Sequence, residues 1–315
     1  MLYTNKKPKF ASQKQKMKKI VECVPNFSEG RDLEKIEQIV GAFRAKPDIK
    51  LLDYSNDTDH NRMVVTLIGE PEAVKNAVVE AVGIAICEID LTKHNGQHPR
   101  MGAADVIPFI PIQGMSLDEA DVLAKETGKI LAEKYDLPVY FYEKSATAAH
   151  RQNLADVRRG EFEGLNEKMQ LPEWAPDFGP KHRHPTAGAS IVGARMPLIA
   201  FNVNLHSTNL KTAREIAKKI RFSNGGLRYC KAMGVELKNQ NCVQVSMNLT
   251  DYTQTTIYQV VEMIRMEAKR YGLNVSGCEL IGLLPMQAVV DTAAYYLGLE
   301  NFSAHQIIES HLNNE

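Results

Sequence analysis

The spacing of hydrophobic and polar residues along the chain predicts where its strands and helices lie. Short apolar runs that end at proline, glycine or polar turns predict strands, as at residues 20–24, "IVECV". Apolar residues three or four apart predict helices, as at residues 33–43. Pro71 suits the first position of a second helix, and Ser116 with Glu119 has the spacing of a capping box that opens a third.

The predicted elements follow one order twice along the chain. Strands and helices from residue 20 to residue 112 read β-α-β-β-α-β, extended by one helix and one strand, and the same order recurs after residue 197. The strand at 105–112 contains two prolines, so we expect a bulge or an edge position there. Each copy fits an antiparallel sheet with helices on one face. The sequence therefore predicts an α+β protein of two tandem ferredoxin-like subdomains with a ligand groove between them.

Segments of different composition suggest the domain boundaries. Residues 1–17 are rich in lysine and contain no acid, which predicts a disordered basic tail. Residues 145–185 are polar and contain several prolines, which predicts a long irregular connector. With 315 residues the chain exceeds one typical core, so we predict an N-terminal subdomain at 18–195 and a C-terminal subdomain at 196–315.

Charge and cysteine usage exclude several classes of protein. The 38 basic residues balance 38 acidic ones, which argues against a nucleic-acid or membrane-surface binder. The five cysteines are odd in number and widely spaced, as is typical of a reducing, cytoplasmic compartment. No apolar run is long enough to span a membrane. Base rates among soluble proteins favour a homodimer.

The stretch "HNGQHPRMGAAD" raises the question of a metal site. His94 and His98 are four residues apart, but Gly96 weakens a helix there and Pro99 biases His98 away from helical dihedrals. A second histidine pair at 182–184 lies between prolines. Neither pair has the third ligand that a metal site requires, so we predict no bound metal.

A single acid–base histidine fits this stretch better than the other chemistries we considered. The chain has no G-x-S-x-G, no P-loop and no G-x-G-x-x-G after a strand. His98 lies in a loop before a predicted inner strand, and the polar loops "PNFSEGR" and "DTDHNR" also follow strands and could converge with it. Histidine titrates near neutral pH, which suits proton transfer to and from amines. A plain surface histidine is the alternative.

Five ordered motifs resemble one known family. They are "VECVPNFSEGR", "HNRMVVTLIG", "HPRMGAADVIPF", "WAPDFGP" and "LIAFNVNL". Together they are similar to the glutamate formiminotransferases, both the stand-alone enzymes and the formiminotransferase part of formiminotransferase-cyclodeaminase. The resemblance covers residues 18 to about 299.

The resemblance implies transfer of a formimino group from N-formimino-L-glutamate to N5 of tetrahydrofolate, as in histidine degradation. Tetrahydrofolate, in cells often polyglutamated, would then be the co-substrate. The family's catalytic histidine corresponds to His98, whereas His94 also matches the pattern without being assigned catalysis. The family's folate-binding stretch corresponds to Gly179, Pro180, Lys181, His182, Arg183, His184, Pro185, Thr186, Ala187 and Gly188.

Substrate carboxylates call for arginines, and the matching motifs contain two. Arg62 and Arg100 are our candidates for binding them, and a structural role in holding loop carbonyls is the alternative for each. For the acid–base step, an ordinary imidazole pKa near 6.5 is expected at His98. Three other functions stay open from the sequence: formiminoglycine as the donor, processing of 5-formyltetrahydrofolate, and folate binding without turnover.

Overall fold

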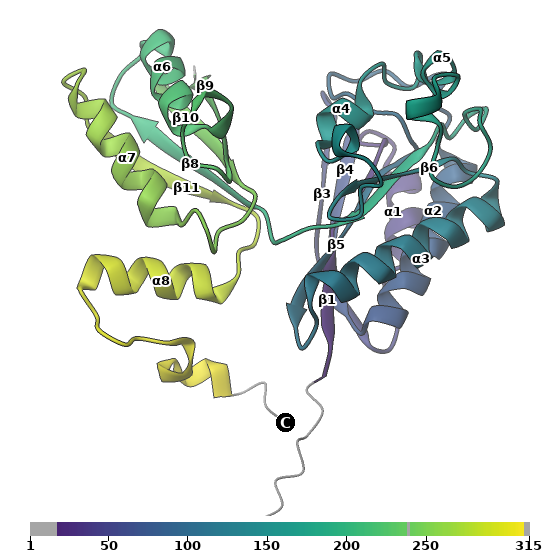
Figure 1. Ribbon diagram of the computed structural model, residues 1–315, viewed down its shortest axis with the longest axis horizontal. Coiled ribbons are helices and arrows are strands. Elements are labelled where there is room, and N and C mark those ends of the chain that lie inside the picture. The colour runs from purple at the N-terminus through teal and green to yellow at the C-terminus, as the bar shows by residue number, and fades with distance from the viewer. Residues whose placement is uncertain (1–17, 238–239, 312–315) are drawn as a thin grey trace, which may run out of the picture. The chain divides into compact units, whose positions relative to one another are not determined.

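The computed structural model describes residues 18–237 and 240–311 (Figure 1), so the predicted basic tail at 1–17 lies outside the described residues. The chain divides into two compact units, the first ending at Arg195 and the second beginning at Met196. Each unit contains its own sheet and its own helices, and the protein is therefore a mixed α+β protein.

The first unit is built on a seven-stranded sheet. Strand β4 pairs with β3 on one side and with β1 and β2 on the other, and β5 pairs antiparallel with β1 and β2. On its other side β5 runs parallel to β7, which runs parallel to β6. These strands are β1 Ile20–Cys23, β2 Asn26–Phe27, β3 Ile49–Asp57, β4 Arg62–Gly69, β5 Ala104–Gln113, β6 Val139–Glu143 and β7 Ser190–Ala194.

Three long helices pack on one face of this sheet and form its main core with residues such as Phe27, Met63 and Phe109. They are α1 Leu33–Gly41, α2 Pro71–Glu88 and α3 Leu117–Tyr135. The predicted helix starts are confirmed: Pro71 lies in the first turn of α2, and Ser116 and Glu119 form both hydrogen bonds of the capping box at α3.

The opposite face of the sheet is covered by the segment between β6 and β7. The sequence predicted an irregular connector, but this segment folds into short helices, which are α4 Leu154–Arg158, α5 Leu165–Met169 and the 3₁₀ turns η1 Ala149–Arg151 and η2 Pro172–Trp174. Val157, Leu165 and Met169 pack in one apolar cluster with Met101 and Tyr140. This second core holds the segment, including its polar side chains, against the sheet.

Two features of the sheet differ from a plain reading of the sequence. Strand β7 was not predicted, because its five residues, "SIVGA", are too short and too small to show a period, yet all five are buried between β5 and β6. Strand β5 is internal rather than an edge, and the expected bulge is present where its register with β2 shifts. The carbonyl of Pro108, further along β5, accepts a hydrogen bond from the Val24 N–H, 3.4 Å away.

The second unit has a four-stranded antiparallel sheet in the order β11-β8-β10-β9. Its strands are β8 Ile199–Leu205, β9 Cys230–Leu237, β10 Cys242–Leu249 and β11 Val275–Ile281. Its helices are α6 Leu210–Ile220, α7 Ile257–Lys269 and α8 Met286–Leu297, with 3₁₀ turns η3 Phe222–Asn224, η5 Ala304–Gln306 and η6 Ile308–His311. Across the described part of the chain, no helix has both the length and the apolar character that crossing a membrane requires.

Candidate functional site

Three loops of the first unit meet at Asn61. Its side-chain Oδ1 accepts a hydrogen bond from the Gly30 N–H at 2.9 Å, and its Nδ2 donates to the Asn95 carbonyl at 3.1 Å. Gly96 lies so close that an added Cβ would be 2.2 Å from the His60 carbonyl oxygen, so only glycine fits. The predicted convergence of the three polar loops is therefore confirmed.

Both ring nitrogens of His94 form hydrogen bonds that hold these loops together. Its Nε2–H donates to the Asn61 carbonyl at 2.9 Å, and its Nδ1 accepts from Nε of Arg100 at 3.1 Å. Burial lowers the pKa of His94, which favours this neutral, doubly hydrogen-bonded ring. No nitrogen is left for a proton transfer, so His94 supports the loop.

Arg100 has a different role from the one predicted. Its Nη1 and Nη2 donate to Glu163 at 2.8 and 2.7 Å, and Nη1 also donates to Glu161 at 3.0 Å. The side chain is buried, and hydrogen bonding to Glu163 raises its pKa despite that burial. Carboxylates of the chain itself occupy the Arg100 guanidinium, which favours the structural alternative over the predicted binding of a substrate carboxylate.

A buried carboxylate, Asp105, lies at the bulge of β5. Asn26 pairs with Val106 and Phe27 pairs with Ala104, so Asp105 is the extra residue between them. A bulge of this kind re-aims a side chain. The carboxylate accepts a hydrogen bond from the Met101 N–H at 2.9 Å and is fully buried.

Two arginines lie against this carboxylate. Nη1 of Arg62 donates to Oδ2 of Asp105 at 2.8 Å, and Nη2 of Arg158 lies 2.8 Å from the same oxygen. Burial raises the pKa of Asp105, but the Arg158 and Arg62 guanidiniums outweigh it and the net shift is downward. Arg62 also donates through Nε and Nη2 to Oδ1 of Asn26, at 3.2 and 2.8 Å. Asp105 is therefore ionised and fixes both guanidiniums.

His98 lies beside this cluster with one ring nitrogen available. Its Nδ1 is 2.7 Å from the Pro99 carbonyl oxygen, and because a carbonyl only accepts, Nδ1 carries the proton and Nε2 holds the lone pair of the neutral ring. Burial first, and then the Arg62 and Arg158 guanidiniums, lower the pKa of His98 to about 4. The expectation of an ordinary imidazole pKa is therefore wrong for the unliganded protein, since positive charge beside a half-buried ring disfavours imidazolium.

The predicted folate-binding segment, 179–188, runs directly alongside the His98 loop. The Ala103 N–H donates to the Ala187 carbonyl, and the Ala189 N–H donates to the Met101 carbonyl, each at 2.9 Å. Gly188 has a φ of +70°, and an added Cβ would lie 2.0 Å from the Met101 carbonyl oxygen. The structure thus brings together two motifs that are about 80 residues apart in the sequence.

The members of this segment have unlike environments. Lys181 and His182 are exposed, whereas Ala187 and Gly188 are buried and form the backbone pairing just described. Nδ1 of His184 accepts from the Ala187 N–H at 3.0 Å, which holds the turn. Of the remaining residues, Gly179, Pro185 and the partly exposed Pro180, Arg183 and Thr186 lie at or near the surface.

Comparison with known proteins agrees with this geometry. The model of the formiminotransferase domain's N-terminal subdomain matches residues 20–195, and that of the formiminotransferase domain matches residues 200–312. The chain belongs to the formiminotransferase family. It is 49% identical to the glutamate formimidoyltransferase of Streptococcus pyogenes, over 94% of this chain and 99% of that protein.

Two further relatives widen the comparison. The glutamate formimidoyltransferase of Thermoplasma acidophilum is 43% identical over 92% of this chain and 96% of its own length. The formimidoyltransferase-cyclodeaminase of Rattus norvegicus is 44% identical over 90% of this chain, which spans 53% of the rat protein. The formiminotransferase family thus includes relatives of this chain's length and others about twice as long.

Asp105 and Arg158 were not predicted as site residues of this formiminotransferase family member. Asp105 could have been found from the sequence, because it is a lone acid at the start of an apolar strand. Such a carboxylate must be paired when it is buried. No sequence pattern singles out Arg158, because it lies in a short helix of a polar segment and reaches the site only through the tertiary fold.

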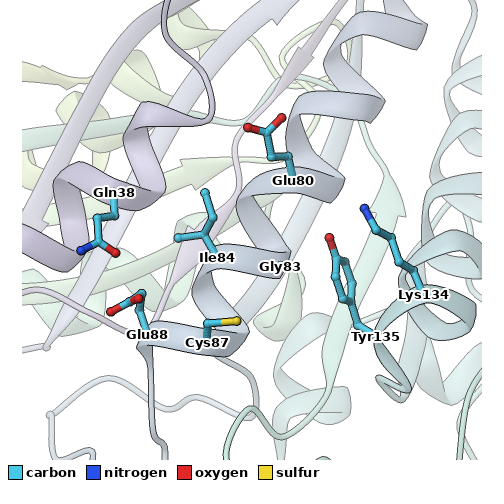
Figure 2. A pocket seen from close by; sticks show the side chains of 8 residues that line it. All are labelled: Gln38, Glu80, Gly83, Ile84, Cys87, Glu88, Lys134 and Tyr135. Carbon is cyan, nitrogen blue, oxygen red and sulfur yellow. The ribbon is translucent and has the colours of Figure 1, made fainter.

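The structure also contains a concave region apart from this site. A concave region of about 590 Å³ is lined by residues of α1, α2 and α3, among them Gly83, Cys87 and Tyr135 (Figure 2), and thus lies on the helix-covered side of the first unit. The hydroxyl of Tyr135 donates to the Val79 carbonyl there at 2.9 Å. Over residues 18–237 and 240–311, no cluster of three or more histidine, cysteine or acidic side chains has the geometry to hold a metal ion.

Proposed function

We propose that the protein transfers the formimino group of N-formimino-L-glutamate to N5 of tetrahydrofolate, giving 5-formiminotetrahydrofolate and L-glutamate. The observation that carries this proposal is the position of His98 in a chain of the formiminotransferase family. Its Nε2 lone pair has no hydrogen-bonding partner among the described residues, and two arginines act on its pKa. The names of the relatives in Streptococcus pyogenes and Thermoplasma acidophilum support the same activity.

The chemistry requires one group that both accepts and returns a proton. N5 of tetrahydrofolate attacks the formimino carbon and forms a tetrahedral adduct, and N5 loses a proton. The bond from this carbon to the glutamate nitrogen then breaks, and that nitrogen gains a proton. We assign both transfers to Nε2 of His98, because its Nδ1–H is held by Pro99 and only Nε2 can take the proton.

For binding, we propose that residues 179–188 contact the folate and that Arg62 contributes to a substrate carboxylate. Lys181 and His182 are exposed in the segment that lies alongside the His98 loop, where a cationic side chain would attract an anionic folate tail. Arg62 donates three of its five N–H groups to Asp105 and Asn26, which leaves two.

Assays with three one-carbon compounds, run in parallel, test this proposal. Purified protein, tetrahydrofolate and either formiminoglutamate or formiminoglycine would be followed by absorbance, and 5-formyltetrahydrofolate would be offered alone. We expect turnover with formiminoglutamate to exceed that with the other two compounds. Binding of tetrahydrofolate without turnover of any donor would overturn the proposal and favour a folate-binding protein.

We further infer that both units are ferredoxin-like and that the protein is cytoplasmic. The strand order β11-β8-β10-β9, with β3-β4-β1-β5 in the first unit, supports the former. The absence of a disulfide among its five cysteines, all of them described, supports the latter. The ligand groove between the subdomains and the homodimer stay predictions.

A further inference from the structure

Arg158 is a buried cation whose hydrogen-bonding capacity is not used within the described residues. Its Nε and Nη2 atoms are buried and have no hydrogen-bonding partner there, although Nη2 lies within ion-pair distance of Asp105. Its side chain is 10% exposed. Unsatisfied donors of a buried guanidinium are costly, and such a group calls for a partner.

The charges around His98 do not balance. Arg62 from β4 and Arg158 from α4 share the single carboxylate of Asp105 from β5. The ring of His60, whose Nδ1 lies 3.1 Å from Oδ1 of Asp57, is 6.0 Å from the His98 ring. Among the described residues whose charge acts on His98, two cations face one anion, which leaves one positive charge without a counterion. An anionic ligand would supply both the missing charge and the missing acceptors.

Arg158 is also held firmly in place. Nζ of Lys168 donates to the carbonyls of Asp156 and Arg159 at 3.0 Å each, which ties down the end of α4 on which Arg158 lies. The same Nζ lies 3.9 Å from the centre of the Trp174 ring, and burial lowers the pKa of Lys168 to about 8. The backbone on both sides of Arg158 is thus fixed, and Asp105 positions the guanidinium itself, so this group is preorganised for a ligand.

We propose that Arg158 binds the α-carboxylate of the formimino donor, next to the nitrogen that His98 protonates. This assignment rests on the proposed function. In N-formimino-L-glutamate the α-carboxylate is one carbon from the reacting nitrogen, whereas the side-chain carboxylate is three carbons from it. A cation beside His98 therefore meets the α-carboxylate first. Arg100 is excluded because Glu161 and Glu163 occupy it.

Binding of this carboxylate has a consequence for the proton transfer. The positive charge of Arg158 helps to keep the ring of His98 neutral in the free protein. A bound carboxylate offsets that charge, so the pKa of His98 rises when the donor is bound, which makes the ring a stronger base for the N5 proton. The donor thus activates the base that acts on it.

The test compares two donors that differ only in the α-carboxylate, N-formimino-L-glutamate and N-formimino-4-aminobutanoate. The variants are Arg158→Met and Arg158→Lys. The matched control is Arg159→Met, because Arg159 is the next residue and its side chain is 79% exposed. Among the described residues, that side chain pairs only with Asp156 in its own turn. Thermal unfolding of each variant checks that the fold is kept.

We expect Arg158→Met to lower kcat/KM for formiminoglutamate about 10- to 100-fold, the usual loss for a hydrogen bond to a charged group. It should leave N-formimino-4-aminobutanoate nearly unchanged, Arg158→Lys should fall between, and Arg159→Met should match the wild type. An equal loss with both donors would overturn the proposal and make Arg158 purely structural. Wild-type protein that uses neither donor would instead refute the proposed function.

A second measurement needs no turnover and no variant. The His98 ring is titrated by NMR in the wild type alone, with L-glutamate and with 4-aminobutanoate. A rise in the pKa of His98 with L-glutamate, and none with 4-aminobutanoate, supports binding of the α-carboxylate at Arg158. The same titration curve in all three samples would overturn it, whatever the assay shows.

Discussion

Nη1 of Arg62 donates to Oδ2 of Asp105 over 2.8 Å, and these side chains are 10% and 0% exposed. The pair connects β4 to the bulge of β5, and Arg158 completes it from the segment that covers the sheet. The charges of Arg62 and Arg158 in this buried cluster also lower the pKa of His98, the proposed acid–base group. Stability and catalysis are linked at this point.

The first prediction concerns His98. The change His98→Gln keeps a hydrogen-bonding side chain but removes the titratable ring, so kcat should fall by about 10²- to 10⁴-fold. Tetrahydrofolate affinity, measured by intrinsic fluorescence, should change little. His206→Gln, in an exposed position of the second unit outside the proposed site, is the matched control and should keep full turnover. Near-normal turnover of His98→Gln would remove this residue from the mechanism.

The second prediction concerns pH. The base form of His98 exists above its pKa, which burial and the two arginines lower to about 4 in the free protein. The acid limb of kcat/KM, which reports the free enzyme, should therefore lie near pH 4 rather than 6.5. The acid limb of kcat, which reports the donor complex, should lie at higher pH. Superimposable limbs would contradict the link between donor binding and proton affinity.

The same pKa shift predicts a loss of stability in acid. The unfolded chain protonates this histidine below about pH 6.5 while the folded protein does not, so the folded state loses stability as the pH falls from 6.5 through 4. His98→Gln should flatten this part of the curve of unfolding free energy against pH, measured with urea. An unchanged slope between pH 6.5 and 4 in the variant would show that other groups cause it.

The fourth prediction concerns Asp105. Replacing it by asparagine leaves two buried guanidiniums without a carboxylate, which should cost about 3–5 kcal/mol of unfolding free energy. Glu133→Gln is the control, because its ion pair with Lys129 is exposed and contributes about 0.5 kcal/mol or less. Urea midpoints for the two variants give the comparison. Equal midpoints would mean that the buried cluster adds no stability.

The fifth prediction concerns Gly96. An alanine there would place its Cβ 2.2 Å from the His60 carbonyl oxygen, so the His98 loop must move. We expect turnover to fall at least tenfold while circular dichroism is unchanged, since small displacements of catalytic groups are costly. Gly41→Ala, at a position with no atom within 4 Å of the added Cβ, should keep wild-type activity. Full activity of Gly96→Ala would show that the loop position is unimportant.

Much of the local structure follows from the sequence alone. The capping box at Ser116 and Glu119 and the helix start at Pro71 depend on residues within one turn, so short windows of sequence contain all the information needed. The resemblance of "HPRMG" to a family motif likewise singled out His98.

Only the tertiary structure decided the rest. Arg100 pairs with Glu161 and Glu163, which are more than 60 residues away, and Arg158 pairs with Asp105 from the segment between β6 and β7. Neither partner is visible in a local pattern. Residues 190–194 form strand β7 because they pair with β5 on one side and with β6 on the other. The low pKa of His98 follows from burial and from cations on two other elements. Contacts between distant segments set the electrostatic environment, whereas the sequence specified which residue would experience it.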